Sequence, residues 1–438
     1  MNYFITGITG TVVPIIIEEL MRKDANPYFY FAIRRGKKNM DVRERFEAAA
    51  NSLDLSLSQK KFLVRRSTPV EIDVEKENMG IDPAMNRELI VNVEKILHGA
   101  ADVRFDQPYE KIKISNVDFT KKVYALFEEI KENRKASGQF PATFYYISTG
   151  YAYGIYKKPI PEDYPDFNPG KPDNTYAQTK AEAKKFLLDK IRRRDDHIVI
   201  FEPTIIGGAA GTGKTRAYNL HYVVMMLGYL GKLPFLTAPD NRPDIVPVDW
   251  VAAVISDIMS KDQYHQGTLR LSMGSRSATI RYMHDLGYHY YTANDPVPGH
   301  VIPKIRFVPR WLFLSMIQFQ KGWYSSLYFV TGMRRYRKII KGIQLLEGYF
   351  PYITGYKVFE NEKSTELIRK YTDYGPAPAL HEIRDEEGNI IEKGYYRKIL
   401  ADTLETGWGG MIDFERLKKR EMHSKSKNPK KVFGFLRK

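Results

Sequence analysis

Asn-Tyr-Phe-Ile-Thr-Gly-Ile-Thr-Gly-Thr-Val-Val, residues 2–13, joins a short apolar run to a segment with apolar residues at helical spacing. A glycine turn between a strand and a helix brings backbone N–H groups to a helix N-terminus, where the pyrophosphate of a dinucleotide binds. The fuller motif has a third glycine where this chain has Val13, so a plain tight strand–helix turn stays the alternative. The candidate cofactor-binding residues of this turn are Thr6, Gly7, Thr9 and Gly10.

Five further apolar runs follow the glycine turn, and helical patterns separate most of them. The runs are residues 28–33, 62–64, 93–97, 144–147 and 197–201, and the clearest helical stretches are 109–134 and 174–193. Strands that alternate with helices pair in parallel through right-handed crossovers. We therefore predict an α/β fold, a Rossmann-type doubly wound parallel sheet with a mostly helical C-terminal substrate or cap region. The predicted parts are a sheet domain over 1–290, a helical, aromatic and basic region over 291–415, and a basic tail over 416–438.

The end of the second predicted strand carries positive charge. Arg34 and Arg35 stand there, followed by Lys37 and Lys38. An acidic residue at this place would accept the ribose hydroxyls of NAD, whereas cations suit the 2′-phosphate of NADP. The pattern therefore predicts NADP(H) as cofactor, with Arg34 and Arg35 at the phosphate. A solvated basic loop is the alternative.

Tyr176 and Lys180 lie four residues apart at the start of a predicted helix, hence on one face. A cation beside a phenol favours the phenolate and lowers the tyrosine pKa from its usual ~10. Such a phenol can exchange a proton with a carbonyl oxygen while a nicotinamide exchanges hydride with the carbon. Thr149, at the end of an apolar strand, supplies a hydroxyl that can hold the same oxygen, and Ser148 is the alternative holder.

Several motifs follow one another in a fixed order between residues 3 and about 260. They are Thr6-Gly7-x-x-Gly10, His98-Gly99-Ala100-Ala101-Asp102-Val103-Arg104-Phe105, Asn116-Val117, Ile147-Ser148-Thr149-Gly150-Tyr151, Asn174-Thr175-Tyr176-x-x-Thr179-Lys180 and Asp244-Ile245-Val246-Pro247-Val248-Asp249-Trp250-Val251. The chain resembles an extended short-chain dehydrogenase/reductase, and within that superfamily the fatty acyl-CoA reductase and thioester reductase branch with its male sterility-type NAD-binding domain. The second and fifth strings are fairly specific to that branch, whereas the glycine and Tyr/Lys motifs are common to the superfamily.

The resemblance implies roles for individual residues. Thr149, Tyr176 and Lys180 match the catalytic hydroxyl, the acid/base and the activating lysine, and Lys180 also reaches the cofactor. The matches to cofactor-contacting positions are Ala100 and Ala101, in the turn along the cofactor, and Asp73, on the adenine side. The implied activity is NADPH-dependent reduction of an acyl thioester or its aldehyde, with acyl-CoA or acyl carrier protein as partner. The departures from the family pattern are Val13 for a glycine, Ile72 for a glycine and Glu202 for an arginine.

Two other readings of the reductase-like motifs stay open, and one further motif competes with them. An epimerase, dehydratase or dehydrogenase acting on a sterol or sugar nucleotide would use the same Tyr/Lys machinery, and a catalytically silent NADP-binding protein would need only the cofactor site.

Residues 208–215, Gly-Ala-Ala-Gly-Thr-Gly-Lys-Thr, satisfy the phosphate-loop pattern of nucleotide hydrolases. No strand ending in an aspartate is placed to hold the metal, so we interpret this stretch as a substrate loop.

The net charge of +16 comes from two segments near the C-terminus. Residues 296–346 carry nine Lys or Arg and no acidic residue, and 416–438 carry ten against a single glutamate. Local basic segments indicate an anionic partner. Because no nucleic-acid-binding signature occurs, we expect no nucleic acid. The cations and aromatics of 304–341 suit an anionic membrane surface, and a helical cap whose aromatics are core is the alternative.

Composition limits the remaining classes. The chain of 438 residues has 43% hydrophobic residues and no cysteine, which excludes a disordered protein, a disulfide scaffold, a cysteine nucleophile and a thiolate metal site. The nine histidines show no ligand spacing, so no metal is expected. Neither a signal peptide nor an apolar stretch of ~20 residues is apparent. We therefore expect a cytoplasmic protein that can bind a membrane surface peripherally.

Overall fold

The computed structural model describes residues 1–35, 40–155, 159–162, 167–194, 197–218, 221–261, 266–354 and 357–419. The chain folds as two units. Unit 1 comprises Met1–Gly207, Asp244–Ser277 and Gln344–Pro378, and unit 2 comprises Gly208–Pro243, Ala278–Ile343 and Ala379–Lys438. Each unit is thus assembled from three separated stretches of the chain. The predicted boundaries at 290 and 415 stay a prediction.

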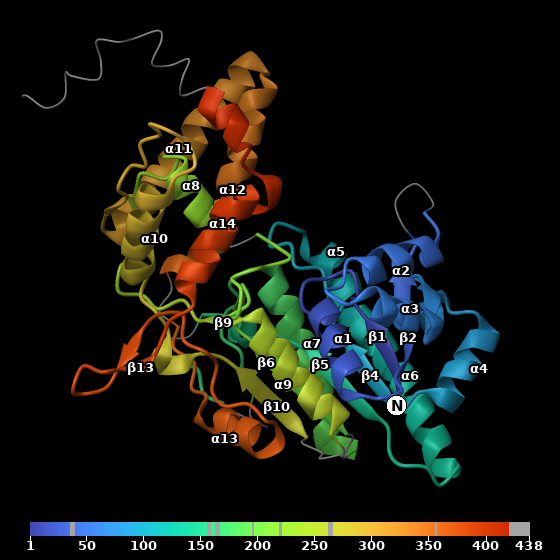
Figure 1. Ribbon diagram of the computed structural model, residues 1–438. Helices are drawn as coiled ribbons and strands as arrows, with labels where there is room; N and C mark the ends of the chain where they lie inside the picture. The colour runs from blue at the N-terminus through green and yellow to red at the C-terminus, as the bar shows by residue number, and fades with distance from the viewer. Residues whose placement is uncertain are drawn as a thin grey trace, which may run out of the picture. The chain divides into compact units, whose positions relative to one another are not determined.

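Unit 1 is built on a seven-stranded sheet in which every pairing is parallel (Figure 1). Its order is β10-β6-β5-β4-β1-β2-β3, so the chain reverses direction across the sheet between β1 and β4. Ligands of open α/β sheets bind outside the strand carboxyl ends at such a reversal. The strands are β1 (Asn2–Thr6), β2 (Tyr28–Arg34), β3 (Ser67–Ile72), β4 (Lys95–His98), β5 (Thr143–Ile147), β6 (Ile198–Pro203) and β10 (Gly267–Leu271). The predicted doubly wound α/β fold is confirmed.

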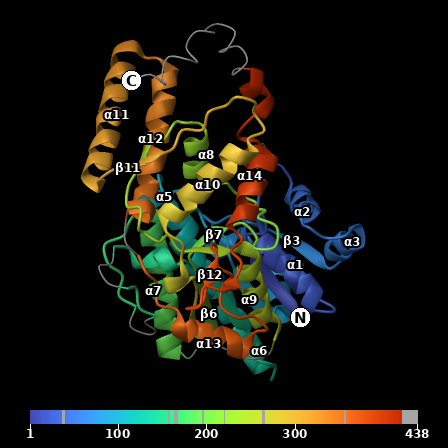
Figure 2. The ribbon, with the colours of Figure 1, turned by 60° about the vertical axis from the view of Figure 1, so that its left-hand side comes forward.

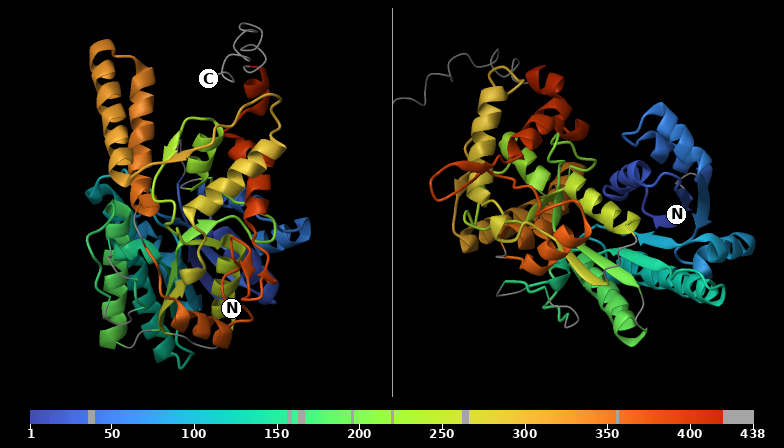
Figure 3. Two further views of the ribbon diagram at one scale, coloured as in Figure 1. Left: turned by 90° about the vertical axis from the view of Figure 1, so that its left-hand side faces the viewer. Right: turned by 60° about the horizontal axis from the view of Figure 1, so that its bottom comes forward.

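Helices cover both faces of this sheet (Figures 1 and 3). α1 (Val13–Lys23) packs against α9 (Val248–Ser260), while α6 (Phe119–Ala136) packs against α4 (Pro83–Asn92) and α7 (Thr175–Arg194). Strands buried between two helical layers read as continuous apolar runs, which is why β1 and β2 are aromatic and β-branched along their length. The remaining elements of unit 1 are α2 (Val42–Asn51), α3 (Leu57–Arg65), α5 (Tyr109–Lys113), β7 (Ile205–Gly207), β9 (Ile245–Pro247) and α13 (Glu362–Tyr371).

One predicted strand is wrong. Residues 62–64 lie inside α3, and the third strand is β3. Ser56 caps α3 by accepting a hydrogen bond from the Gln59 N–H, and the Gln59 side chain accepts from the Ser56 N–H in return. Such a reciprocal cap fixes a helix start, so a short apolar run inside the next two turns becomes its buried face.

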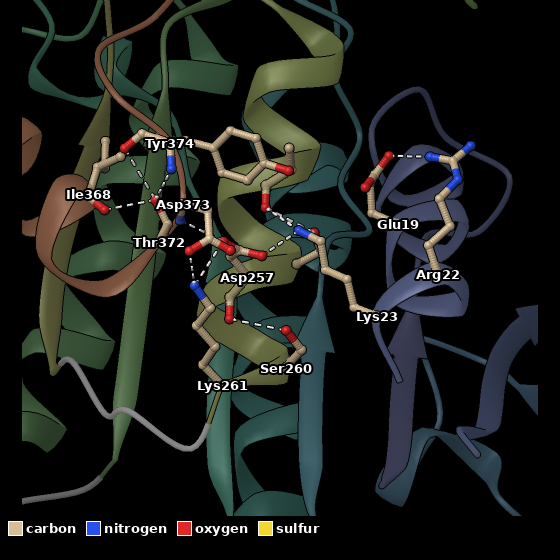
Figure 4. Close-up of polar contacts among 12 residues, drawn as sticks. Glu19, Arg22, Lys23, Asp257, Ser260, Lys261, Ile368, Thr372, Asp373 and Tyr374 are labelled. Atoms are coloured by element: carbon tan, nitrogen blue, oxygen red, sulfur yellow. Dashed lines mark hydrogen bonds and ion pairs between the residues drawn. The ribbon is translucent and has the colours of Figure 1, made fainter. Parts of the chain in front are cut away.

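The stretch Gln344–Pro378, which we call the return segment, comes back to unit 1 from far along the chain. Figure 4 shows how its end is fastened. Asp257 on α9 accepts from Lys23 of α1, from Lys261 and from the Asp373 N–H at 2.9 Å. Burial raises the pKa of the Asp257 carboxyl, but these hydrogen bonds outweigh burial and leave it below its usual value. The return segment therefore belongs to unit 1 through a half-buried ionic cluster.

Unit 2 is mostly helical in the part that the structure describes. Its elements are α8 (His221–Tyr229), β8 (Phe235–Leu236), α10 (Ile280–Asn294), β11 (Arg306–Phe307), α11 (Arg310–Thr331), β12 (Ile383–Arg384), β13 (Ile390–Glu392) and α14 (Tyr396–Gly410). α12 (Arg334–Thr354) begins in unit 2 and ends in the return segment. α11 and the start of α12 lie side by side, joined at the left-handed Gly332 (Figures 2 and 3).

Candidate active site

The glycine turn between β1 and α1 has the backbone that its sequence predicts. Gly7 has a φ of +97°, a conformation that favours glycine, and a Cβ there would lie 2.9 Å from the Ala100 nitrogen. The Gly10 N–H donates to the Gly7 carbonyl at 2.8 Å. Among the described residues, no side chain caps the first turn of α1. An uncapped helix start behind a glycine turn is a site for an anion such as a pyrophosphate.

Thr6 makes hydrogen bonds within the protein that its motif does not indicate, and its place among the cofactor-binding residues stays a prediction. Its hydroxyl accepts from the Ala100 N–H at 3.0 Å and bonds the His98 Nδ1 at 2.8 Å, and the side chain is fully buried. The other ring nitrogen of His98 contacts the Thr120 hydroxyl at 3.0 Å. Burial, and secondarily the charge of Lys180, lower the pKa of His98 to about 3, so this imidazole is neutral. Thr6 and His98 therefore fix the Ala100–Ala101 turn beside the glycine turn.

A π-helical turn, Ile114–Asp118, places Asn116 between that turn and α7. The Asn116 amide donates to the Thr179 hydroxyl at 3.0 Å, and its oxygen accepts from the Asp102 N–H at 2.7 Å. π-helical turns are frequent at functional sites. The sequence motif contained Asn116 and His98 without indicating what either does, because their partners are distant in the sequence.

Tyr176 and Lys180 share one face of α7, but the lysine bonds elsewhere. The Lys180 ammonium donates to the Ile147 carbonyl at 2.6 Å and to the Tyr146 hydroxyl at 3.1 Å. Burial lowers the pKa of Lys180 to about 7 and raises the pKa of Tyr176 above its usual value. The predicted lowering of the Tyr176 pKa by Lys180 is wrong for this structure, because burial dominates and the lysine bonds to β5. A protonated phenol at neutral pH suits a proton donor.

Two hydroxyls follow β5 at the same edge of the sheet. The Thr149 hydroxyl accepts from the Tyr151 N–H at 3.3 Å and so caps the short helical turn Gly150–Tyr153. The neighbouring Ser148 hydroxyl is buried and has no hydrogen-bond partner among the described residues. A buried hydroxyl without a partner costs free energy unless a ligand satisfies it. Both hydroxyls are thus available to a bound group.

The cations at the end of β2 divide into two roles. Arg35 pairs with Glu71 at 2.5 Å, while Arg34 is exposed and acts electrostatically on Asp102. Burial raises the pKa of the Asp102 carboxyl, but Arg104 and Arg34 outweigh it and leave it low. Lys37 and Lys38 lie outside the described residues. Asp73, just beyond β3, accepts from the Glu75 N–H at 3.0 Å and so closes a turn.

The structure explains two of the three departures from the family pattern. A Cβ on Gly99, which directly follows β4, would overlap the Cγ2 of Val13. Because Gly99 has no side chain, there is room for Val13 at the position where the family has a glycine. Glu202, where arginine is common, is fully buried between two cations. It lies 2.5 Å from Lys184 and 3.5 Å from Arg270, and Lys184 is one turn beyond Lys180 on α7.

The phosphate-loop pattern at 208–215 does not adopt the expected strand–loop–helix geometry. The loop bonds to itself, since the Ala209 N–H donates to the Lys214 carbonyl at 2.9 Å and the Thr215 hydroxyl donates to the Ala217 carbonyl at 3.1 Å. In a phosphate loop the lysine and threonine open the helix. Here α8 begins only at His221, so Lys214 and Thr215 do not open a helix, and the interpretation of this stretch as a substrate loop stays a prediction.

Comparison with known families now identifies the fold and its site. The family model NAD_binding_4, described as Male sterility protein, matches residues 5–255. The chain belongs to this family. The match contains the glycine turn and the Tyr176–Lys180 pair, and it ends before the return segment. The predicted membership of the male sterility-type branch of extended reductases is confirmed.

Curated relatives and solved structures agree with this assignment. Fatty acyl-CoA reductase wat of Drosophila melanogaster is 25% identical over 87% of this chain and 80% of its own. Aldehyde reductase lnaA of Aspergillus flavus is 26% identical over 59% of this chain, and the first curated relatives align over only about a quarter of their own length. The terminal R domain of the myxalamid PKS-NRPS biosynthetic pathway has a TM-score of 0.68 at 19% identity, covering 94% of this chain and 92% of that one. That likeness shows the fold.

Two further findings concern the described residues alone. Within them, no group of three or more His, Cys, Asp or Glu side chains is arranged to hold a metal ion. None of the helices described is long and apolar enough to cross a membrane.

Proposed function

We propose that the protein is an NADPH-dependent reductase of an acyl thioester or of the derived aldehyde. The observation that carries this proposal is one edge of the sheet of unit 1, where Thr149, Tyr176 and Lys180 follow β5 and open α7 beside the glycine turn. Family membership and relatives named as fatty acyl-CoA and aldehyde reductases support the same chemistry.

The residues at this edge fit a nicotinamide dinucleotide. Gly7, Gly10 and the uncapped start of α1 would hold the pyrophosphate, with Thr9 beside them. The Ala100–Ala101 turn would lie along the cofactor, and the orphaned Ser148 hydroxyl marks a polar position awaiting a partner. The cofactor supplies a hydride when bound. Asp73 would lie on the adenine side.

The chain's own residues would handle the carbonyl oxygen. As hydride reaches the carbonyl carbon, negative charge develops on the oxygen, where the Thr149 hydroxyl donates a hydrogen bond and Tyr176 gives its proton. Burial keeps the Tyr176 phenol protonated at neutral pH, as a donor requires. The resulting hemithioacetal then loses the thiol and leaves the aldehyde. Lys180 would bind the ribose hydroxyls and replace the proton.

The choice of NADPH over NADH depends on Arg34. Arg34 and Arg35 are both exposed at the end of β2, but Arg35 pairs with Glu71 whereas Arg34 lies near the Asp102 loop. A guanidinium there matches a 2′-phosphate. Arg34→Glu should weaken NADPH binding and leave NADH binding nearly unchanged, as measured by fluorescence titration, with Arg43→Glu on α2 as control. Equal wild-type affinities for the two cofactors would contradict this assignment.

The catalytic assignment is tested with Tyr176→Phe. NADPH oxidation with dodecanoyl-CoA and with dodecanal should be abolished while NADPH still binds, because the phenol is needed only for proton transfer. Retained turnover would mean that another residue is the acid. A UDP-sugar that stabilises the protein more than the acyl-CoA would favour the epimerase or dehydratase alternative. Delivery by CoA or by an acyl carrier protein is distinguished by offering both thioesters.

We further propose an anionic membrane surface as a partner of unit 2. Phe313 and Ile317 form the buried side of α11, but five other large apolar side chains of this helix are 58–90% exposed. Cations accompany them without any acidic residue over 296–346. Exposed aromatics beside cations suit the headgroup layer of an anionic bilayer. The exposed apolar residues meant here are Trp311, Phe319, Trp323, Phe329 and Val330.

Vesicle sedimentation tests this location. The protein should bind phosphatidylserine-containing vesicles at low salt, bind neutral vesicles weakly, and lose binding as salt screens the charges. Trp311→Ser with Trp323→Ser should reduce binding, whereas Ile391→Ser, at another exposed apolar position of unit 2, should not. Protein that stays in the supernatant with anionic vesicles at low salt would contradict the proposal and leave the cations to a CoA or carrier contact.

A further inference from the structure

The return segment, which lies outside the residues matched by the family model, packs against the proposed catalytic tyrosine through one intermediary ring. The Phe105 ring lies 5.6 Å from the Tyr176 ring, measured between centroids. On its other sides Phe105 stacks on Tyr352 at 5.4 Å and 15°, and meets Tyr349 edge-on at 5.7 Å. Tyr349 and Tyr352, near the end of α12, therefore pack on the Phe105 ring, which in turn packs on Tyr176.

Tyr352 also reaches the backbone on which Tyr176 stands. The Asn174 side-chain oxygen accepts from the Ala177 N–H at 2.8 Å and so caps the start of α7. The Asn174 amide group donates to the Tyr352 hydroxyl at 3.3 Å. One side chain of the return segment thus contacts both the ring beside Tyr176 and the helix cap two residues before it.

Tyr352 is itself held firmly. It is buried, its ring lies 4.6 Å from that of Tyr151, and the Lys357 ammonium lies 5.8 Å from its centroid. Lys357 forms a buried ion pair with Asp173, which directly precedes the α7 cap. Gly348 allows α12 to approach this closely, because a Cβ there would lie 3.2 Å from the Phe105 Cβ. Tyr352 is thus buried in contact with Phe105, Tyr151, Asn174 and Lys357.

We propose that Tyr352 is a positioning residue for Tyr176, acting through Phe105 and Asn174. This inference rests on the proposed function, in which the Tyr176 phenol must point at a carbonyl oxygen. Proton transfer depends on hydrogen-bond reach, and a misplacement of 1 Å can cost about 100-fold in rate. A side chain contributed by the return segment thus sets the geometry of a residue within the family-matched region.

The first test reads the Tyr176 ring directly and needs no substrate. With 3-fluorotyrosine placed at residue 176 of the full chain, the 19F resonance reports the ring current of Phe105. Tyr352→Ala should move this resonance, Tyr352→Phe should restore it largely because the ring stack is kept, and Tyr124→Ala should leave it in place. Tyr124 is an equally buried tyrosine of unit 1 whose ring packs on Phe127, Phe144 and Phe186, and not on Phe105 or Tyr176.

The second test uses turnover of NADPH with dodecanal. Tyr352→Ala should lower kcat roughly 10- to 100-fold while the NADPH dissociation constant stays within about twofold, and Tyr352→Phe should recover most of the loss. If Tyr352→Ala does not fold, Gly348→Ala gives a second perturbation, because its methyl group displaces Phe105 and should move the same resonance. A resonance at the wild-type position in the Tyr352→Ala or Gly348→Ala variant, or one moved as far by Tyr124→Ala, would overturn the proposal. Activity retained by Tyr176→Phe would instead overturn the proposed function.

Discussion

The close fit of Val13 against Gly99 predicts a reciprocal pair of substitutions. Gly99→Ala would place a methyl group into the space of the Val13 Cγ2 and 3.1 Å from the Ile147 Cδ1. Val13 is 2% exposed in the first turn of α1 and cannot move away without shifting the helix. Overpacking of this kind costs about 1–3 kcal/mol. Gly99→Ala alone should therefore lower the free energy of unfolding of unit 1 by that amount.

Shortening Val13 should relieve the clash that Gly99→Ala creates. Val13→Ala deletes two buried methyl groups and should cost about 1.6 kcal/mol at ~0.8 kcal/mol per buried carbon, slightly offset by the better helix propensity of alanine. In that background the methyl group of Gly99→Ala occupies space that the valine left. The double variant should thus be more stable than the sum of the two single effects by about 1–3 kcal/mol.

The coupling is measured by unfolding in urea, with hydrogen exchange in peptides from β1 and β4 as the readout, so that the result reports on this part of the sheet. The four variants of the cycle are the wild type, the two single variants and the double variant. Effects that add to within about 0.5 kcal/mol would show that Val13 and Gly99 do not share one space. That result would refute the explanation of how this chain tolerates a valine in its glycine motif.

Three other outcomes follow from the buried charges and from the loop of unit 2. Glu202→Gln leaves two buried cations without their counter-charge and should cost about 3–5 kcal/mol in urea unfolding. The control Glu132→Gln, at a side chain that is 67% exposed, should stay within ~0.5 kcal/mol, and similar small effects for both would contradict the buried network. The pKa of Lys180 is about 7 in the folded protein, below its value of 10.5 in the unfolded chain. Its burial therefore destabilises the folded state most below pH 7, and this destabilisation declines as the pH rises from 7 to 10.5. Lys180→Met should accordingly stabilise the apo protein more at pH 6.5 than at pH 9.5, and an equal effect at the two pH values would exclude this titration. ATP with Mg²⁺ should not raise the melting temperature, and Lys214→Ala should leave reductase turnover within a few-fold; a magnesium-dependent thermal shift would restore the phosphate-loop interpretation.

Local sequence determined the elements and their order. The glycine turn with φ of +97° at Gly7, the strand–helix alternation and the i,i+4 placement of Tyr176 and Lys180 all depend on residues close together in the chain. Turn chemistry, capping and hydrophobic periodicity act over such short separations. The same reasoning failed at residues 62–64, where a short apolar run fits a strand and a helix equally well and a cap decided for the helix.

Only the tertiary structure decided which groups meet. It paired the Thr6 hydroxyl with His98, and it directed the Lys180 ammonium to the Ile147 carbonyl. It also made Glu202 a buried counter-ion and brought Tyr352 against the ring beside Tyr176, 176 positions earlier in the chain. No local sequence pattern predicts these pairings, because they form where segments distant in the sequence pack against one another in the interior.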